Sequence, residues 1–165
     1  LHLIRNCEDV VASAIDGQIR YADRNAFSGG ITHWVRHWNR AAETHLRYAG
    51  APRHLVLRYE DFIAAPQATL QLVRGFAGLG AGAPGTAPAI ADLSLEPWKA
   101  ASLNHPPRRP QRKFEQLFGP QLRAWLRQQL GDYEAISAEL QRRQAHLLPP
   151  PAAPLHAAWI SDGAA

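Results

Sequence analysis

An arginine that ends an apolar stretch, with a serine eight residues later, is a pattern that can bind phosphate. The chain opens with LHLIRNCEDVVASAI, in which Leu1–Ile4 is typical of a buried strand and helical spacing begins near Glu8. The guanidinium of Arg5 can bind a phosphate through two parallel hydrogen bonds, and a helix start offers free backbone N–H groups. The hydroxyl of Ser13 can donate another bond. Taken together, Arg5, the helix start and Ser13 predict half of a phosphate site. Taken separately, Arg5 fits a surface arginine and Ser13 fits a small residue that packs in a helix.

A second set of polar residues lies in HLVLRYEDF, which predicts another strand. Leu55, Leu57 and Tyr59 are expected to share one face of it. Taken separately, Tyr59 fits a half-buried core residue, Glu60 a partner for a nearby arginine, and Asp61 a helix cap. Together the three end a strand, which is also where parallel sheets bind ligands.

Helical periodicity marks most of the remaining chain. Ile31–Tyr48 carries an apolar stripe and ends at Gly50-Ala51-Pro52, and the next helix is led by Pro66. One long amphipathic helix is predicted from Phe114, with Gly131 as its C-terminal cap, and a shorter helix follows. Residues 78–88 and 98–112 are expected to be irregular. The predicted buried sides contain Val11, Ile15 and Ile19 in the first helix, Leu70, Leu72, Val73, Phe76 and Ala77 in the third, and Phe114, Leu117, Phe118, Leu122, Trp125 and Leu126 in the fourth.

The order strand–helix–helix–strand–helix predicts an α/β fold, in which helices cover a parallel sheet. Ligands in such sheets bind beyond the carboxyl ends of the strands, so Arg5 and Tyr59 are expected at one edge. Residues 1–147 form one predicted domain. Residues 148–165 are rich in proline and alanine and are expected to be a disordered tail.

The order and spacing of these pieces resemble the sulfotransferase superfamily, whose members use 3′-phosphoadenosine-5′-phosphosulfate as sulfuryl donor. In the family, a strand ends in arginine, with an acidic residue and a serine beyond it. A tryptophan-containing helix, a strand ending in Tyr-Glu-Asp, a proline-led helix and Phe-x-Gly-Leu follow. The matching residues are Arg5, Asn6, Asp9, Ser13, Trp34, Trp38, Tyr59, Glu60, Asp61, Pro66 and Phe76–Leu79. The resemblance covers residues 1 to about 80, and more loosely Arg108 to Tyr133.

This resemblance implies roles for individual residues. Arg5 and Ser13 match the residues that bind the 3′-phosphate of the nucleotide, and Tyr59 matches a tyrosine that contacts adenine. A basic loop late in the family also reaches the nucleotide, and its candidates here are Arg108, Arg109, Arg112 and Lys113. The implied fold is a three-layer parallel sheet like that of P-loop NTPases. The implied substrates are the nucleotide sulfuryl donor and an acceptor hydroxyl or amine, without a metal.

The chain departs from the family pattern in several places. Cys7 stands where the family usually has proline, and no glycine-rich turn carrying lysine follows a strand. That turn and the general base lie upstream in the family. We therefore expect the C-terminal half of a sulfotransferase, inactive alone, with the N-terminal half missing, and assign no catalytic residue. His33 and His37 are spaced like a metal pair, but no third ligand is in place.

Composition leaves other functions open. The net charge of +4 suits anionic partners, and the single cysteine fits a reducing, cytoplasmic location. No apolar run approaches the roughly 20 residues of a membrane span. The alternative function is a non-catalytic basic module that binds nucleic acid or another polyanion through Arg108, Arg109 and Arg112. Aromatic residues are not interleaved with that cluster, so nucleic acid is not the expected partner. A relative of the P-loop kinases is a third possibility.

Overall fold

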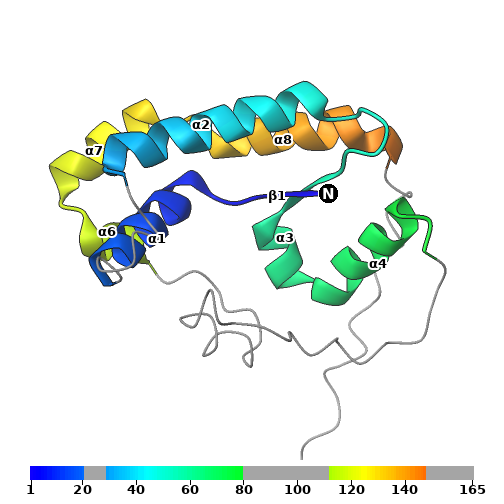
Figure 1. Cartoon of the computed structure of the whole chain (residues 1–165), viewed down its shortest axis with the longest axis horizontal. Coiled ribbons are helices and arrows are strands. Elements are labelled where there is room, and N and C mark those ends of the chain that lie inside the picture. The colour runs from blue at the N-terminus through cyan, green and yellow to red at the C-terminus, as the bar shows by residue number, and fades with distance from the viewer. Residues whose placement is uncertain (21–28, 80–111, 148–165) are drawn as a thin grey trace, which may run out of the picture.

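The computed structural model describes residues 1–20, 29–79 and 112–147, which are mostly helical around two short strands (Figure 1). The elements are β1 (His2–Ile4), α1 (Cys7–Arg20), α2 (Ile31–Tyr48), β2 (Val56–Arg58), α3 (Tyr59–Ala64), α4 (Pro66–Phe76), α6 (Lys113–Leu117), α7 (Pro120–Gln129), α8 (Tyr133–Gln144) and the 3-10 turn η3 (Ala145–Leu147). The general α/β class is confirmed. The loops predicted at 80–88 and 98–111 and the tail predicted at 148–165 lie outside the described residues.

The two strands pair in parallel, as the sequence predicts. His2 lies opposite Val56, and Ile4 lies opposite Arg58. The His2 N–H donates to the carbonyl of Leu55 over 2.8 Å. Because the strands run in the same direction, their carboxyl ends meet at one edge, where α1 and α3 begin.

The outer edge of β2 is closed by a side chain of α8. Gln144 accepts a hydrogen bond from the Val56 N–H at 3.1 Å and donates one to the Val56 carbonyl at 2.7 Å. Its amide therefore takes the place of a neighbouring strand. Gln144 is only 4% exposed, so both backbone groups of Val56 are kept from water without being left unpaired.

The core lies between the strands and the long helices. In Figure 1, α2 and α8 lie side by side along one face of the strands, and α3 and α4 lie on the other side. Apolar side chains from both ends of the chain fill this core, which consists of Ile4, Cys7, Val11, Ala12, Val35, Trp38, Ala42, Val56, Phe114, Phe118, Leu126, Leu130, Tyr133 and Leu140. The rings of Trp38 and Tyr133 meet edge to face, with centroids 6.4 Å apart. This contact joins α2 to the start of α8.

The single helix predicted from Phe114 is in fact two helices. The backbone is extended at Phe118, Gly119 precedes α7, and Pro120 begins it. Proline lacks an N–H donor and disfavours a helical conformation in the preceding residue, so a continuous helix stops here. Phe114, Phe118 and Leu126 are buried, but Leu117 and Trp125 are exposed, so the predicted apolar stripe is wrong at these two positions.

Three further expectations need correction. Tyr59 begins α3 instead of ending β2. Gly131 does not cap α7 in a left-handed conformation; the residue is close-packed, because a Cβ there would lie 3.0 Å from Ile136 and 3.3 Å from Trp38. Ile19 is 66% exposed instead of buried. By contrast, Gly50 follows α2 with a φ of 82°, as the predicted stop requires.

The apolar side of α4 is largely uncovered within the described residues. Thr69 is the buried residue of this helix, and Leu70 is 46% exposed. Together with Leu3, Leu57 and Val73, Leu70 lines an apolar groove of about 240 Å³. The prediction that Leu70 and its neighbours are buried is therefore not met.

We predict that Gln144→Ala destabilises the fold by about 1–3 kcal/mol, because it leaves a buried N–H and a buried carbonyl of β2 without partners. Urea denaturation would measure the loss. Gln141→Ala, at an exposed position of the same helix, is the matched control and should change stability little. Equal effects of the two substitutions would contradict the edge-closing role of Gln144.

Candidate functional site

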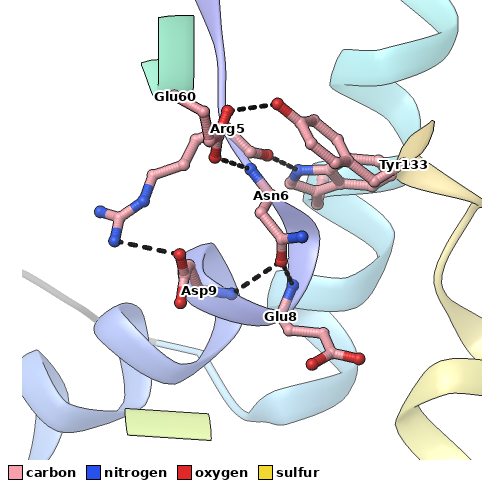
Figure 2. A network of polar contacts seen from close by, with 7 residues as sticks. Arg5, Asn6, Glu8, Asp9, Glu60 and Tyr133 are labelled. Atoms are coloured by element: carbon pink, nitrogen blue, oxygen red, sulfur yellow. Dashed lines mark hydrogen bonds and ion pairs between the residues drawn. The ribbon is translucent and has the colours of Figure 1, made fainter. Parts of the chain in front are cut away.

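Arg5 and Tyr59 meet at the carboxyl edge of the strand pair, as the sequence predicts. The guanidinium carbon of Arg5 lies 4.7 Å from the centre of the Tyr59 ring. One guanidinium nitrogen also lies 3.5 Å from the Asp9 carboxylate, and Figure 2 shows this ion pair beside the turn. The Nε of Arg5 is buried and has no hydrogen-bond partner within the described ranges. Arg5 therefore has an unsatisfied donor, on a side chain that is 28% exposed.

The first turn of α1 differs from the expectation of free N–H groups. The side chain of Asn6 accepts hydrogen bonds from the N–H groups of Glu8 at 2.9 Å and Asp9 at 3.4 Å. Asparagine is a preferred N-cap residue for this reason. An anion at this edge would thus be held by side chains such as Arg5, since Asn6 already occupies these two backbone donors.

Three distant elements fix the backbone of the Arg5-Asn6 turn (Figure 2). From α2, the indole N–H of Trp38 donates to the carbonyl of Arg5 over 3.0 Å. From α3, a Glu60 oxygen accepts from the Asn6 N–H over 3.0 Å, and from α8 the hydroxyl of Tyr133 donates to the other Glu60 oxygen. Glu60 therefore binds a backbone amide and a phenol, not the arginine expected from sequence.

Tyr133 is the site residue that sequence reasoning missed. The sequence pattern gave it no role in the site, and it is buried. In addition, Arg58 donates from Nε to the Tyr133 oxygen at 3.4 Å and lies over its ring at 5.4 Å. Burial, with the hydrogen bond to Glu60, raises the pKa of Tyr133 to about 12. The phenol thus remains a protonated donor at neutral pH.

Two more groups beside the turn have altered pKa values. Burial raises the pKa of Asp9, and the neighbouring Arg5 guanidinium offsets part of that rise. Burial likewise raises the pKa of Cys7 to about 11, so this thiol is neutral near pH 7. Its sulfur lies 3.8 Å from the carbonyl of Gly131. The thiolate is the nucleophilic form of cysteine, so Cys7 is a packing residue here and not a nucleophile.

Ser13 lies one turn beyond Asp9 along α1 and is half-buried. Residues four apart share one face of a helix, so Asp9 and Ser13 lie on the same face of α1, which begins at Cys7. In the described part of the chain no hydrogen bond joins Ser13 to Arg5 or Tyr59. The predicted set therefore comes together in part, with Arg5 and Tyr59 in contact and Ser13 further along α1.

The basic residues predicted near the C-terminal end of the resemblance lie in different environments. Arg109 lies outside the described residues. Arg112 is exposed at the start of α6, and Lys113 is held by Asp16 at 2.5 Å. Asp16 also pairs with Arg20 at 2.8 Å. Lys113 therefore anchors α6 to α1, whereas Arg112 projects to solvent.

A cleft of about 310 Å³ opens on the other side of the turn, with Asn6, Cys7, Arg127 and Tyr133 among its lining residues. Arg127 spans it by pairing with Glu8 at 2.5 Å. In the three described ranges no cluster of histidine, cysteine, aspartate and glutamate is arranged to hold a metal ion. Within the same ranges, no helix combines the length and apolar character needed to cross a membrane.

Comparison with protein-family models, with curated proteins and with solved structures gave no match for this chain. A functional conclusion must therefore come from the residues and geometry of the Arg5 and Tyr59 edge.

We predict that Asp16→Asn lowers stability at neutral pH by about 1–3 kcal/mol, because it removes a charged acceptor from Lys113. Burial alone would raise the pKa of Asp16, but the hydrogen bonds from Lys113 and Arg20 lower it below its ordinary value. The stabilisation is thus complete above the unfolded pKa of about 3.9 and disappears as pH falls through the lower folded pKa. Urea denaturation across this pH range would measure the difference between the two proteins.

The matched control for this substitution is Glu43→Gln, at an exposed position of α2. It should change stability little at any pH. A difference between wild type and Asp16→Asn that stays constant from neutral to strongly acidic pH would contradict the role of the ionised carboxylate.

Proposed function

We propose that this chain is the nucleotide-binding C-terminal part of a sulfotransferase, and that it binds the 3′-phosphate and adenine of 3′-phosphoadenosine-5′-phosphosulfate. One observation carries the proposal: the Arg5 guanidinium lies over the Tyr59 ring, at the carboxyl edge of a parallel strand pair, with a buried Nε that has no partner among the described residues. Parallel sheets bind ligands at this edge. The finer fold, a three-layer sheet like that of P-loop NTPases, belongs to the same proposal.

The chemistry of Arg5 suits a phosphate. A guanidinium presents parallel N–H donors that match two phosphate oxygens, one of which would satisfy the unpaired Nε. Its present partner, Asp9, is a single carboxylate oxygen at 3.5 Å, which is beyond ordinary hydrogen-bond length. A phosphate can therefore replace Asp9 with a better-paired arrangement. Ser13, on the same face of α1 as Asp9, would donate to the phosphate from the far side.

Tyr59 supplies an aromatic surface next to that phosphate position. Its ring already carries the Arg5 guanidinium on one side. In the proposed complex, the adenine lies against Tyr59 while the 3′-phosphate lies against Arg5. Arg109 and Arg112 remain candidates for a second cationic contact, with Arg112 exposed at the start of α6.

In the proposed reaction, an acceptor oxygen or nitrogen forms a bond to sulfur as the bond from sulfur to the 5′-phosphate oxygen breaks. The products are the sulfated acceptor and 3′,5′-bisphosphoadenosine, and the acceptor proton passes to a base. Basic groups stabilise charge on the transferring and bridging oxygens, as in phosphoryl transfer. We propose no catalytic residue among the described residues 1–20, 29–79 and 112–147.

We predict that Arg5→Ala weakens binding of 3′,5′-bisphosphoadenosine by about 1.5–3 kcal/mol, the usual contribution of a hydrogen bond to a charged group. Binding of 5′-AMP, which lacks the 3′-phosphate, should change little. Isothermal titration calorimetry on the full chain would measure both affinities. Arg36→Ala, which removes an exposed arginine from α2 and changes the net charge equally, is the control.

Equal losses for both nucleotides in Arg5→Ala would contradict the 3′-phosphate role. Wild-type binding that ignores the 3′-phosphate and falls steeply with salt would favour the polyanion-binding module instead. A wild-type preference for ATP over the 3′-phosphorylated nucleotide would favour a kinase relative.

A further inference from the structure

The Arg5 side chain makes only weak polar contacts with the described residues. Its ion pair with Asp9 spans 3.5 Å, its Nε has no hydrogen-bond partner in the described ranges, and its guanidinium lies over the face of the Tyr59 ring. The direction in which Arg5 points therefore depends on the backbone of the turn that carries it. That backbone is held firmly on both sides, by Trp38 at the Arg5 carbonyl and by Glu60 at the Asn6 N–H.

We infer that Tyr133 and Glu60 are positioning residues for Arg5, with the Tyr133 hydroxyl holding one Glu60 oxygen so that the other stays on the Asn6 N–H. This inference rests on the proposed function, because it assigns the purpose of the arrangement to 3′-phosphate selectivity. Neither residue touches the nucleotide in the proposed complex. Both act through the backbone between Arg5 and Asn6 (Figure 2).

Tyr133 is well placed to be a fixed donor. It is the first residue of α8, directly after Asp132, whose side chain caps the helix by accepting from the N–H groups of Glu134 and Ala135 at 3.0 and 3.1 Å. Arg58 bonds to its oxygen and stacks on its ring. Because Arg58 donates to the phenol oxygen, the phenol hydrogen is directed to Glu60. The order of donation is thus Arg58 to Tyr133 to Glu60.

Glu60 can accept the hydrogen bonds from Tyr133 and from the Asn6 N–H at the same time. An ionised carboxylate only accepts hydrogen bonds, and its two oxygens can take one donor each. Without the Tyr133 hydroxyl, the Glu60 side chain would lose one of its two anchors and rotate more freely. The Asn6 N–H would then lose a charge-assisted partner, which is stronger than a neutral one. Arg5 would follow the loosened backbone and exchange between Asp9 and the phosphate position.

The test is the pair of affinities for 3′,5′-bisphosphoadenosine and 5′-AMP, measured on the full chain carrying Tyr133→Phe. We expect the preference for the 3′-phosphorylated nucleotide to fall about tenfold, with the affinity for 5′-AMP nearly unchanged. Tyr48→Phe, which removes a hydroxyl from an exposed tyrosine of α2, is the matched control and should keep the preference. A merely structural role would lower both affinities together.

Two substitutions of Glu60 make the test independent of how well Tyr133→Phe folds. Glu60→Gln retains an oxygen for the Asn6 N–H, but its NH₂ meets the Tyr133 hydroxyl as a second donor and can bond to the phenol oxygen only when the phenol hydrogen turns away. It should therefore retain more of the preference than Glu60→Ala, which removes both bonds. The alanine variant should lose the preference to the same extent as Tyr133→Phe. Equal preference in the glutamine and alanine variants would overturn the inference.

Nuclear magnetic resonance gives a readout that needs no nucleotide. In Tyr133→Phe, the Asn6 amide should exchange with solvent faster and the Arg5 Nε–H should become more mobile, while both stay unchanged in Tyr48→Phe. Unchanged Asn6 and Arg5 signals in Tyr133→Phe would overturn the positioning role. A wild-type chain without preference for the 3′-phosphate would overturn the proposed function instead, and these signals would still decide the positioning role.

Discussion

The parallel register of β1 and β2 is the constraint on which the candidate site depends. With Ile4 opposite Arg58, the next residue of each chain segment, Arg5 and Tyr59, leaves its strand at the same level. The 4.7 Å contact between the guanidinium and the ring follows from this alignment. A slip of one residue would move one partner along its strand and turn alternate side chains to the opposite face, so register and site would be lost together.

Helix α8 maintains that alignment from both of its ends. Its first residue, Tyr133, reaches Glu60 beyond the carboxyl end of β2, and its last residue, Gln144, pairs with Val56 at the start of the same strand. The helix therefore runs antiparallel to β2 and spans its length. A two-stranded parallel sheet has few hydrogen bonds of its own. Side-chain contacts such as these therefore contribute much of the stability of the strand pair. Contacts to the candidate site and contacts that stabilise β2 therefore come from one helix.

Sequence periodicity predicted the elements better than their contacts. The bounds of α2, the parallel pairing and the meeting of Arg5 with Tyr59 follow from local patterns and from the rule for strand ends. The break before Pro120 and the N-cap at Asn6 were not predicted, although proline and asparagine have known positional preferences that point to both. The bond from Tyr133 to Glu60 could not be predicted, because it depends on where a helix far along the chain packs, and spacing does not encode that.

The Asn6 cap also explains why the candidate phosphate position falls on side chains. At many anion sites the first N–H groups of a helix provide the binding charge. Here Asn6 occupies the N–H groups of Glu8 and Asp9, so that source is already in use. Among the described residues, the Arg5 guanidinium provides positive charge beside this cap, where it pairs with Asp9 at 3.5 Å. A single carboxylate oxygen at 3.5 Å from the guanidinium makes a longer contact than the paired hydrogen bonds that a phosphate can offer. In the proposed complex, Arg5 would therefore exchange its pairing with Asp9 for a pairing with the phosphate.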